Sequence, residues 1–562
     1  MFATKSNYNP AAWRHENTRL ARFSDGILFT VVVFLISTMA SCSGGQKTSP
    51  PPVPDFSLTI SPVSTSAVVG NTTSKVTVSV EPQNGFTGSV QVTLQGLPSG
   101  ASAIPGPSFS LKAGGSQDLQ FSISASTPVG LSQVNVQGSS GSNSHTAQFV
   151  LTIEPIVSVT TYQSGSLLYL ESHSSTDTAR IGLETQWGGS VVEVSLNGTN
   201  YVNEHDTGRE VQVAQYDGAA QYDNCAGCSG TFGWNPVQGG DEYSDGSPVL
   251  SQTLAPDSLY IKAQPYQWNP SDKGGGPGQP VLGDVYVEST VSAVADHAFT
   301  FKVHFKITHF GTDQHANSIQ EFPAVYANLA TDRFLSDSST TPWTNATVAP
   351  YTMPQLPNGS PTLYTSEQWG AFVDSQGLGL TVFVPGMAPY IGGFAAAGDS
   401  GPTGFGTEYF APRTFFSFGP NKVLEGDVYL IAGDYKHARQ VVYDLHNKLP
   451  PKDIFTPIGS VDVPAPNAQL SGPTNVSGWA FDDTAVAKVD VYVDGAIAGT
   501  ATYGGSRPDV SNDWPHAPSN IGYSFSLNTT AYSNGAHVIS VRATDSTGNV
   551  AVFSDVPVTI QN

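Results

Sequence analysis

The sequence predicts an all-β protein in which a large antiparallel β-assembly is flanked by two smaller β-sandwiches. Glycine (57) and proline (40) are abundant among the 562 residues, only 12% of residues are charged, and 10% are aromatic. Coiled coils and helical bundles need far more charged residues, and disordered chains contain fewer aromatic ones. Short alternating runs of polar and apolar residues recur between turn residues, as expected for strands joined by hairpins. The length accommodates about three or four domains.

The charge balance is strongly acidic. Lysine and arginine total 23 against 45 aspartate and glutamate residues, which gives a net charge of −22. A surface of this sign repels nucleic acid and anionic lipid headgroups, so we expect neither as a partner of the folded domains. The sequence contains no phosphate-binding loop, Ser-His-Asp signature, HExxH motif or dinucleotide fingerprint. We therefore predict no cofactor and no metal ion.

Residues 1–41 are predicted to be an export signal. Three arginines precede the apolar run Ile27–Ile36, which is shorter than the ~20 residues of a membrane-spanning helix. The following run Met39-Ala40-Ser41-Cys42 resembles the lipobox of bacterial lipoproteins. This resemblance implies that Cys42 is lipidated and anchors the protein in the bacterial cell envelope. The alternative is ordinary cleavage and secretion. Residues 42–54, rich in Gly and Ser and then Pro, are predicted to be a semi-stiff tether.

The chain has three cysteines, Cys42, Cys225 and Cys228. With Cys42 lipidated, the other two form an even pair in an oxidising compartment. Their CxxC spacing is compatible with a metal half-site, a redox pair or a small disulfide. A zinc site needs further ligands, and no second CxxC or nearby histidine pair is present. We therefore favour a disulfide between Cys225 and Cys228 that stiffens a glycine-rich loop.

Residues 55–155 are predicted to form the first small sandwich. Phe56–Ile60 and Val76–Val80 alternate with a period of two, and the Asn84-Gly85 pair indicates a tight turn. The stretch from this turn to Gly100 resembles the immunoglobulin-like modules of bacterial secreted proteins. No group of polar residues stands out, so we expect this domain to be a spacer.

Residues 458–562 are predicted to form the second small sandwich. Val489–Val493 alternates and runs into the turn Asp494-Gly495. The segments Ser506–Val510 and Gly522–Phe525 resemble a bacterial Ig-like module that is often appended to extracellular enzymes. Four aspartates here have oxygen ligands that suit calcium, but their spacing matches no calcium loop and favours solvated turns: Asp482, Asp483, Asp509 and Asp513.

Residues 156–457 are predicted to form the large central assembly. Val285–Val291 and Phe299–Thr308 are long strands that we expect to pair across an intervening turn. Strands of this length favour a two-sheet supersandwich. A helical period is visible only over Ala438–Leu445.

The central block resembles the galactose mutarotase-like supersandwich. The resemblance rests on the Gly-Gly strand Trp187–Gly198 and on the D-x-G-R-x-x-Q segment Asp206–Gln212. That fold serves sugar epimerases and the β-domains of carbohydrate hydrolases and lyases, which implies that Arg209 and Gln212 bind substrate. Arg209 has a fork of donors for sugar hydroxyls or a uronate, and Gln212 both donates and accepts. The alternative for Arg209 is a buried ion pair that orients its loop.

Aromatic side chains gather in glycine-rich loops of the same block. Trp234 and Tyr243 lie in the run Phe232–Tyr243, and Trp268 follows in a second loop. Glycine lets the backbone approach a ligand closely, and flat rings stack on pyranose faces. We therefore predict that these three rings bind substrate rather than fill the core.

Three ionisable residues are candidates for catalysis. Glu321 interrupts an otherwise apolar or amide-bearing strand, where burial raises a carboxyl pKa toward a general acid or base role. His315 is its candidate partner, since the mutarotase family uses a His acid and a Glu base. Asp241 is a candidate second carboxylate for glycoside hydrolysis. The structural alternative for Glu321 is a salt bridge to Arg333 or Arg209.

These patterns predict a cell-surface lipoprotein that binds an extracellular polysaccharide or oligosaccharide through its central supersandwich. Two alternatives remain open. One is a polysaccharide-processing enzyme, either a glycoside hydrolase or a lyase, that uses carboxylates of the same domain. The other is a structural adhesin.

Overall fold

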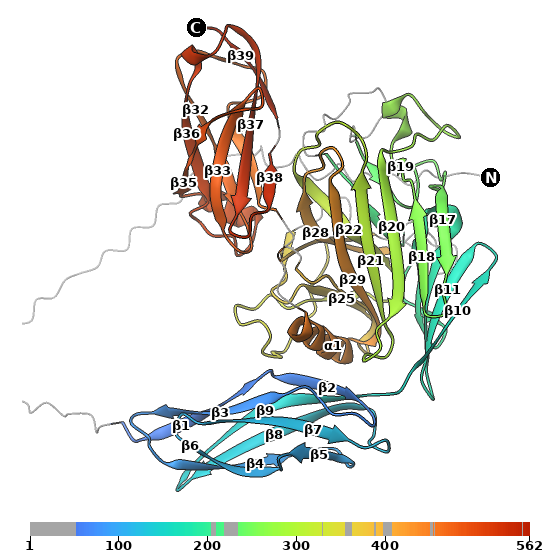
Figure 1. Ribbon diagram of the computed structural model, residues 1–562, viewed down its shortest axis with the longest axis vertical. Coiled ribbons are helices and arrows are strands. Elements are labelled where there is room, and N and C mark those ends of the chain that lie inside the picture. Colours follow the sequence, from blue (N-terminus) through green and yellow to red (C-terminus); the bar gives the residue numbers. More distant parts are fainter. Residues whose placement is uncertain are drawn as a thin grey trace, which may run out of the picture.

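The computed structural model describes residues 52–203, 210–217, 234–328, 330–354, 362–386, 389–396, 407–449, 453, 456–553 and 555–562. Strands dominate this part of the chain, and the predicted all-β class with two flanking sandwiches is confirmed. Figure 1 shows three groups of strands, which we call the N-terminal sandwich, the central domain and the C-terminal sandwich. Among the described residues, no helix has the length and apolarity needed to cross a membrane.

The N-terminal sandwich packs two sheets around one apolar core. Alternation along its strands buries one face completely, so that Phe56 and Val78 are 0% exposed. Asn84 and Gly85 both have positive φ angles, 51° and 78°, as a tight hairpin turn requires. The first sheet contains β1 (Asp55–Ser61), β3 (Val76–Gln83), β7 (Ser116–Ile123) and β5 (Ala101–Ile104), in that order. The second contains β2 (Ser64–Val68), β9 (Asn143–Glu154), β8 (Gly130–Ser140), β4 (Ser89–Gln95) and β6 (Ser108–Lys112).

The central domain contains the largest sheet, of 12 strands, which we call the large sheet. Its main path is antiparallel, and the earlier strands of the central sequence join the later ones where β15 pairs with β22 and β22 pairs with β28. The path runs through β10 (Ser158–Ser164), β11 (Leu167–His173), β12 (Thr178–Glu184), β13 (Ser190–Leu196), β15 (Val211–Ala214), β22 (Ser318–Ala327), β28 (Thr407–Phe416), β27 (Tyr390–Ala396) and β24 (Thr362–Tyr364). The short strands off this path are β14 (Thr199–Asn200), β16 (Pro236–Val237) and β19 (Tyr266–Gln267).

A second sheet of 8 strands faces the large sheet. The predicted pair of long strands is confirmed, because Val285 lies opposite His309 and Ala293 opposite Phe301. This sheet contains β17 (Val249–Leu254), β18 (Ser258–Ala263), β20 (Val285–Ala293), β21 (Thr300–His309), β29 (Val423–Asp434), β26 (Leu378–Phe383), β25 (Trp369–Val373) and β23 (Arg333–Leu335). The apolar core between the sheets draws on both of them, with Phe305 of one against Phe322 of the other.

The predicted helical period forms α1 (Tyr435–Lys448). Asp434 caps its N-terminus by accepting a hydrogen bond from the Lys436 amide. One face of α1 packs Val441 and Val442 against the second sheet, beside Trp369. Two short 3-10 helices also lie in the central domain, at Thr185–Trp187 and Pro270–Lys273.

The C-terminal sandwich again packs two sheets around one core. The first contains β30 (Ile458–Val463), β32 (Pro473–Phe481), β36 (Gly522–Asn528) and β35 (Thr502–Gly505). The second contains β31 (Ala468–Leu470), β39 (Val556–Ile560), β37 (Gly535–Asp545), β33 (Val486–Val493) and β34 (Ala496–Thr500), with β38 (Val550–Val552) beside β37. A short helix, α2 (Pro508–Asp513), and a 3-10 turn at Thr529–Ala531 complete the sandwich.

Candidate functional site

The large sheet carries polar and aromatic side chains on the face turned away from the central core. On β22, Phe322 and Val325 point into the core, whereas Ala324 and Tyr326 belong to a separate cluster with two residues of β28. We call this side of β22, β28, β27 and β24 the outer face. A face that is not needed for the core is where a sheet can present functional groups.

Glu321 and Arg413 lie directly opposite each other on this face, as cross-strand partners of β22 and β28. Glu321 is partly buried, and Arg413 is 1% exposed. Burial raises the pKa of Glu321 despite hydrogen bonds from Tyr409 and Tyr216. Burial also lowers the pKa of Arg413 to about 9. The pair therefore places an acid that holds its proton more firmly than usual next to a cation.

Two tyrosines extend this pair along the strands. Tyr326 and Tyr409 are cross-strand partners with ring centroids 5.0 Å apart. The hydroxyl of Tyr409 donates to Glu321. We refer to Glu321, Tyr326, Tyr409 and Arg413 as the Tyr-Glu-Arg cluster.

A cavity of about 190 Å³ opens where the central domain meets the C-terminal sandwich. Tyr364 and Tyr390 line it from the central side, and the ring of His516 stacks on Tyr364 with centroids 4.2 Å apart. Asp482 and Asp483 place carboxylates at the same cavity. Flat rings combined with carboxylate acceptors suit a ligand that has both apolar faces and hydroxyl groups.

Arg413 connects the cavity to the cluster. Its Nη1 donates to Thr362 Oγ1 at 2.8 Å, on the same strand as Tyr364. Its guanidinium also lies 5.7 Å from the ring centroid of Trp514, which contacts Tyr390. Ile391 pairs with Pro412, which places Tyr390 opposite Arg413, and Tyr390 pairs with Tyr364. Cross-strand partners share a face, so the cluster and the cavity lie on one face across the consecutive strands β22, β28, β27 and β24, three strand spacings or ~14 Å apart.

The residues predicted from the loops lie elsewhere. Gln212 is 3% exposed and accepts a hydrogen bond from the Gly239 amide. Asp241 is 2% exposed and accepts hydrogen bonds from the amides of Tyr243 and Asp245, which shapes the loop. The hydroxyl of Tyr243 is within 3.0 Å of Ser271 Oγ. The binding and catalytic roles assigned to these residues stay predictions.

Trp268 belongs to the same loop region. Its amide donates to the Asn235 carbonyl, and its own carbonyl accepts from the Glu242 amide. These backbone bonds join the two loops that the sequence analysis singled out. The predicted stacking role of Trp268 remains untested.

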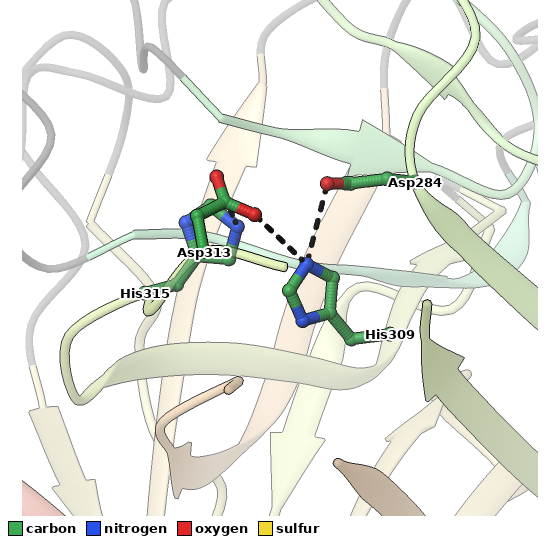
Figure 2. A group of neighbouring side chains, drawn as sticks. All are labelled: Asp284, His309, Asp313 and His315. Atoms are coloured by element: carbon green, nitrogen blue, oxygen red, sulfur yellow. Dashed lines mark hydrogen bonds and ion pairs between the residues drawn. The ribbon is translucent and has the colours of Figure 1, made fainter. Parts of the chain in front are cut away.

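Trp234, the predicted stacking ring, packs against His315, the predicted partner of Glu321. Trp234 is 5% exposed, and its ring stacks on His315 with centroids 3.8 Å apart. Its indole nitrogen donates to Asp284 Oδ1 at 2.6 Å. Although burial opposes it, the neighbouring His309 and the hydrogen bond from Trp234 lower the pKa of Asp284 to about 2. Figure 2 shows the carboxylates of Asp284 and Asp313 directed at a ring nitrogen of His309, with His315 beside Asp313.

Several predictions concern residues outside the described part of the chain. These are the signal peptide, the lipidation site Cys42, the cysteines Cys225 and Cys228, and Arg209. The sequence analysis offered a salt bridge to Arg333 as the structural alternative for Glu321. In the structure, Glu321 lies opposite Arg413, and Arg333 lies near Asp332.

Sequence analysis missed Arg413, Tyr409 and Tyr364. A usable signal was present, because Arg413 is the one charged residue within the apolar run Phe410–Phe415. An arginine is almost never fully buried unless its charge is paired, so a single arginine in a buried strand indicates a polar or charged partner nearby.

Residues 457–541 match the family model of the bacterial Ig domain. The C-terminal sandwich is therefore an Ig-like module, as its sequence predicted. No curated protein matches the chain.

Solved structures show only distant similarity. An endo-beta-1,4-mannanase from Thermotoga petrophila is 19% identical over 23% of this chain and 24% of its own, with a TM-score of 0.15. The polysaccharide lyase BACCELL_00875 is 7% identical over 71% of this chain and 48% of its own, with a TM-score of 0.25. The protein HI1317 is 10% identical over 49% of this chain and 98% of its own, also with a TM-score of 0.25. The match spans less than half of the mannanase or the lyase, and these scores are too low to carry a functional argument.

Proposed function

We propose that the protein is a cell-surface lipoprotein that binds an extracellular polysaccharide along the outer face of its central domain, a galactose mutarotase-like supersandwich. The observation that carries the proposal is the cavity lined by rings and carboxylates on the same face as the Tyr-Glu-Arg cluster. Tyr364 offers a stacking surface, and Asp482 accepts hydrogen bonds from hydroxyls. The lipid anchor on Cys42 would hold this face outside the cytoplasm.

The binding test uses the purified chain and a panel of immobilised neutral and acidic polysaccharides. Tyr364→Ala removes a ring of the cavity and is expected to reduce retention at least tenfold. Tyr162→Ala is the matched control, because Tyr162 also pairs with another tyrosine but lies on β10, at the other end of the large sheet. Equal retention of both variants and the parent chain would contradict the proposal.

A second candidate function is elimination or hydrolysis of the bound glycan. The specific observation in its favour is the hydroxyl of Tyr409, which donates to a carboxyl of raised pKa opposite a buried arginine. In a lyase, a tyrosine abstracts the proton next to a uronate and a cation stabilises the resulting charge. The described residues of the cluster contain one carboxyl, whereas hydrolysis needs two flanking the bond, so elimination fits better.

Product release separates binding from catalysis. A lyase would generate unsaturated ends that absorb in the ultraviolet, and both Tyr409→Phe and Glu321→Gln would abolish this signal while retention persisted. Retention with no product from the parent chain supports the binding function alone. Neither retention nor product would favour an adhesin.

A further inference from the structure

We propose that Asp284, His309, Asp313 and His315 form a binding site for one divalent transition-metal ion, most consistent with zinc. The four side chains come from the start of β20, the end of β21 and the loop that leads to β22. One ligand atom from each lies within 4.8 Å of all the others. Figure 2 shows the four side chains. This inference does not depend on the proposed function.

Three contacts within this group are close to the edge length of a coordination tetrahedron. His309 Nε2 lies 3.2 Å from Asp284 Oδ2 and 3.5 Å from Asp313 Oδ1, and His315 Nε2 lies 3.6 Å from Asp313 Oδ2. Zinc binds nitrogen and carboxylate oxygen at ~2.0–2.2 Å, which places neighbouring tetrahedral ligands ~3.3–3.6 Å apart. The four ligand atoms all lie within 4.8 Å of one another, so small side-chain rotations that close the longer separations would complete the tetrahedron.

Each histidine is oriented so that its Nε2 is the free ligand atom. His309 Nδ1 lies 2.8 Å from the Gly419 carbonyl, which only accepts hydrogen bonds, so this nitrogen carries the proton. His315 Nδ1 lies 2.9 Å from Asp217 Oδ2 and donates to it in the same way. A carbonyl or carboxylate behind the imidazole is the usual arrangement for histidines that bind metals.

The neutral rings leave lone pairs directed at carboxylates. His315 is 4% exposed, and its Nε2 makes no hydrogen bond to any described residue. A buried nitrogen directed at a carboxylate without a proton between them is unfavourable. A bound cation would accept the Nε2 lone pairs of both histidines and neutralise the facing carboxylates. A proton on His309 Nε2 alone would leave His315 Nε2 without a partner.

The remaining contacts resemble the outer shell of a metal centre. Trp234 donates its indole hydrogen to Asp284 Oδ1, which orients the other oxygen toward His309. Trp234 also covers one face of His315. Two imidazoles and two carboxylates favour zinc over calcium or magnesium, which prefer oxygen ligands alone.

Metal content is measured directly on the purified chain. After equilibration with a slight excess of zinc chloride and gel filtration, mass spectrometry of the metal is expected to give one zinc per chain. X-ray absorption is expected to show nitrogen and oxygen neighbours without sulfur. Absence of bound zinc, or a sulfur-only coordination shell, would overturn the proposal.

Variants locate the ion. Asp313→Asn is the primary variant, because the Asp313 side chain is 64% exposed and its replacement should not disturb folding. It is expected to weaken zinc binding at least tenfold in calorimetric titration, as is His315→Gln. His304→Gln is the matched control. His304 lies on β21, as His309 does, and also contacts two carboxylates, but neither of them belongs to the proposed metal site. Retention of zinc by Asp313→Asn and His315→Gln would show that the ion is held elsewhere, and would overturn the assignment.

A double variant controls for binding by thiols. Cys225→Ser with Cys228→Ser is expected to retain one zinc per chain with parental affinity. Loss of the ion from this variant alone would assign zinc to the cysteines and overturn the proposal. Addition of zinc is also expected to raise the melting temperature of the parent chain and of His304→Gln, but not that of Asp313→Asn.

Discussion

The two small sandwiches dock onto the central domain by opposite chemistry. At the N-terminal junction, Glu154 of β9 accepts a hydrogen bond from His437 of α1 at 2.8 Å and lies 3.6 Å from His297. His297 in turn lies 2.8 Å from Asp444 of α1. Figure 1 shows α1 between the N-terminal sandwich and the central strands. This junction is a buried network of charged and polar groups.

The C-terminal junction is aromatic. Trp514 packs on Tyr390, Phe415 and Phe481, with centroid distances of 5.3–5.7 Å. Apolar contact tolerates small shifts, whereas a hydrogen-bonded charge network fails when one partner is lost. The comparison therefore indicates that the first junction is held by its charged groups and the second mainly by packed apolar area. The predicted role of the N-terminal sandwich as a spacer is compatible with a fixed orientation.

The largest expected effect comes from Trp514→Ala. It removes the ring at the centre of the aromatic junction and is expected to destabilise docking of the C-terminal sandwich by about 3–4 kcal/mol. Hydrogen exchange of β30 measures the change. Trp514→Phe should cost much less, and equal exchange in the parent chain and Trp514→Ala would show that the aromatic cluster does not hold the junction.

Glu154→Gln tests the polar junction. The carboxylate is 0% exposed, and its replacement removes the buried negative charge that faces His437 and His297. We expect a cost of about 2–3 kcal/mol, measured as faster hydrogen exchange in α1. Glu425→Gln is the control, because Glu425 also contacts a histidine but is half exposed, and it should leave exchange unchanged. A similar effect of both variants would contradict the special role of the buried network.

The two junctions should also respond oppositely to acid. Despite burial, hydrogen bonds from His297 and His437 lower the pKa of Glu154 to about 2 from 4.5. Its contribution is complete above pH 4.5 and is lost as the pH falls toward 2, at a cost of about 2–3 kcal/mol. Against the effect of burial, hydrogen bonds that His297 donates to Asp444 and Glu154 raise its pKa. Its contribution is therefore present below pH 6.5 and is lost as the pH rises through the raised value.

Asp482 gives the C-terminal junction the opposite dependence on pH, because its contribution to stability is largest in acid. Burial, with repulsion from Asp453 and Asp545, raises the pKa of Asp482 from 3.8 to about 6. Its contribution favours the folded state below pH 3.8 and is lost as the pH rises through 6. Calorimetry at pH 3, 5.5 and 7 should show the N-terminal transition weakest at pH 3 and the C-terminal transition unweakened there. Parallel shifts of both transitions would refute the contrast.

The smallest effect is expected for Lys448→Met. Lys448 lies 2.6 Å from Asp444 but is 41% exposed, so solvent screens the pair. We expect a change of about 0.5 kcal/mol in hydrogen exchange of α1. A loss as large as that of Glu154→Gln would show that the network extends to the surface.

The amino-acid sequence by itself determined the β-class, the pairing of β20 with β21 and several turns. Alternation with a period of two specifies which face is buried, and Asn84-Gly85 specifies the turn, because both signals act over a few residues. The helix α1 and the hairpin of β20 and β21 were predictable for the same reason. The Ig-like character of the C-terminal sandwich followed from local motifs as well.

Only the tertiary structure decided which side chains meet. Glu321 was predictable as an unusual carboxyl, but its partner Arg413 lies 92 positions later in the sequence. Asp284 and His309 lie at one end of the predicted hairpin, but their meeting with His315 depends on the course of the loop after β21, which no local pattern encodes. Such contacts depend on the order of the strands in the sheets and on loops that bring residues far apart in the sequence into contact. For that reason the sequence pointed to individual residues, and the fold determined their chemistry.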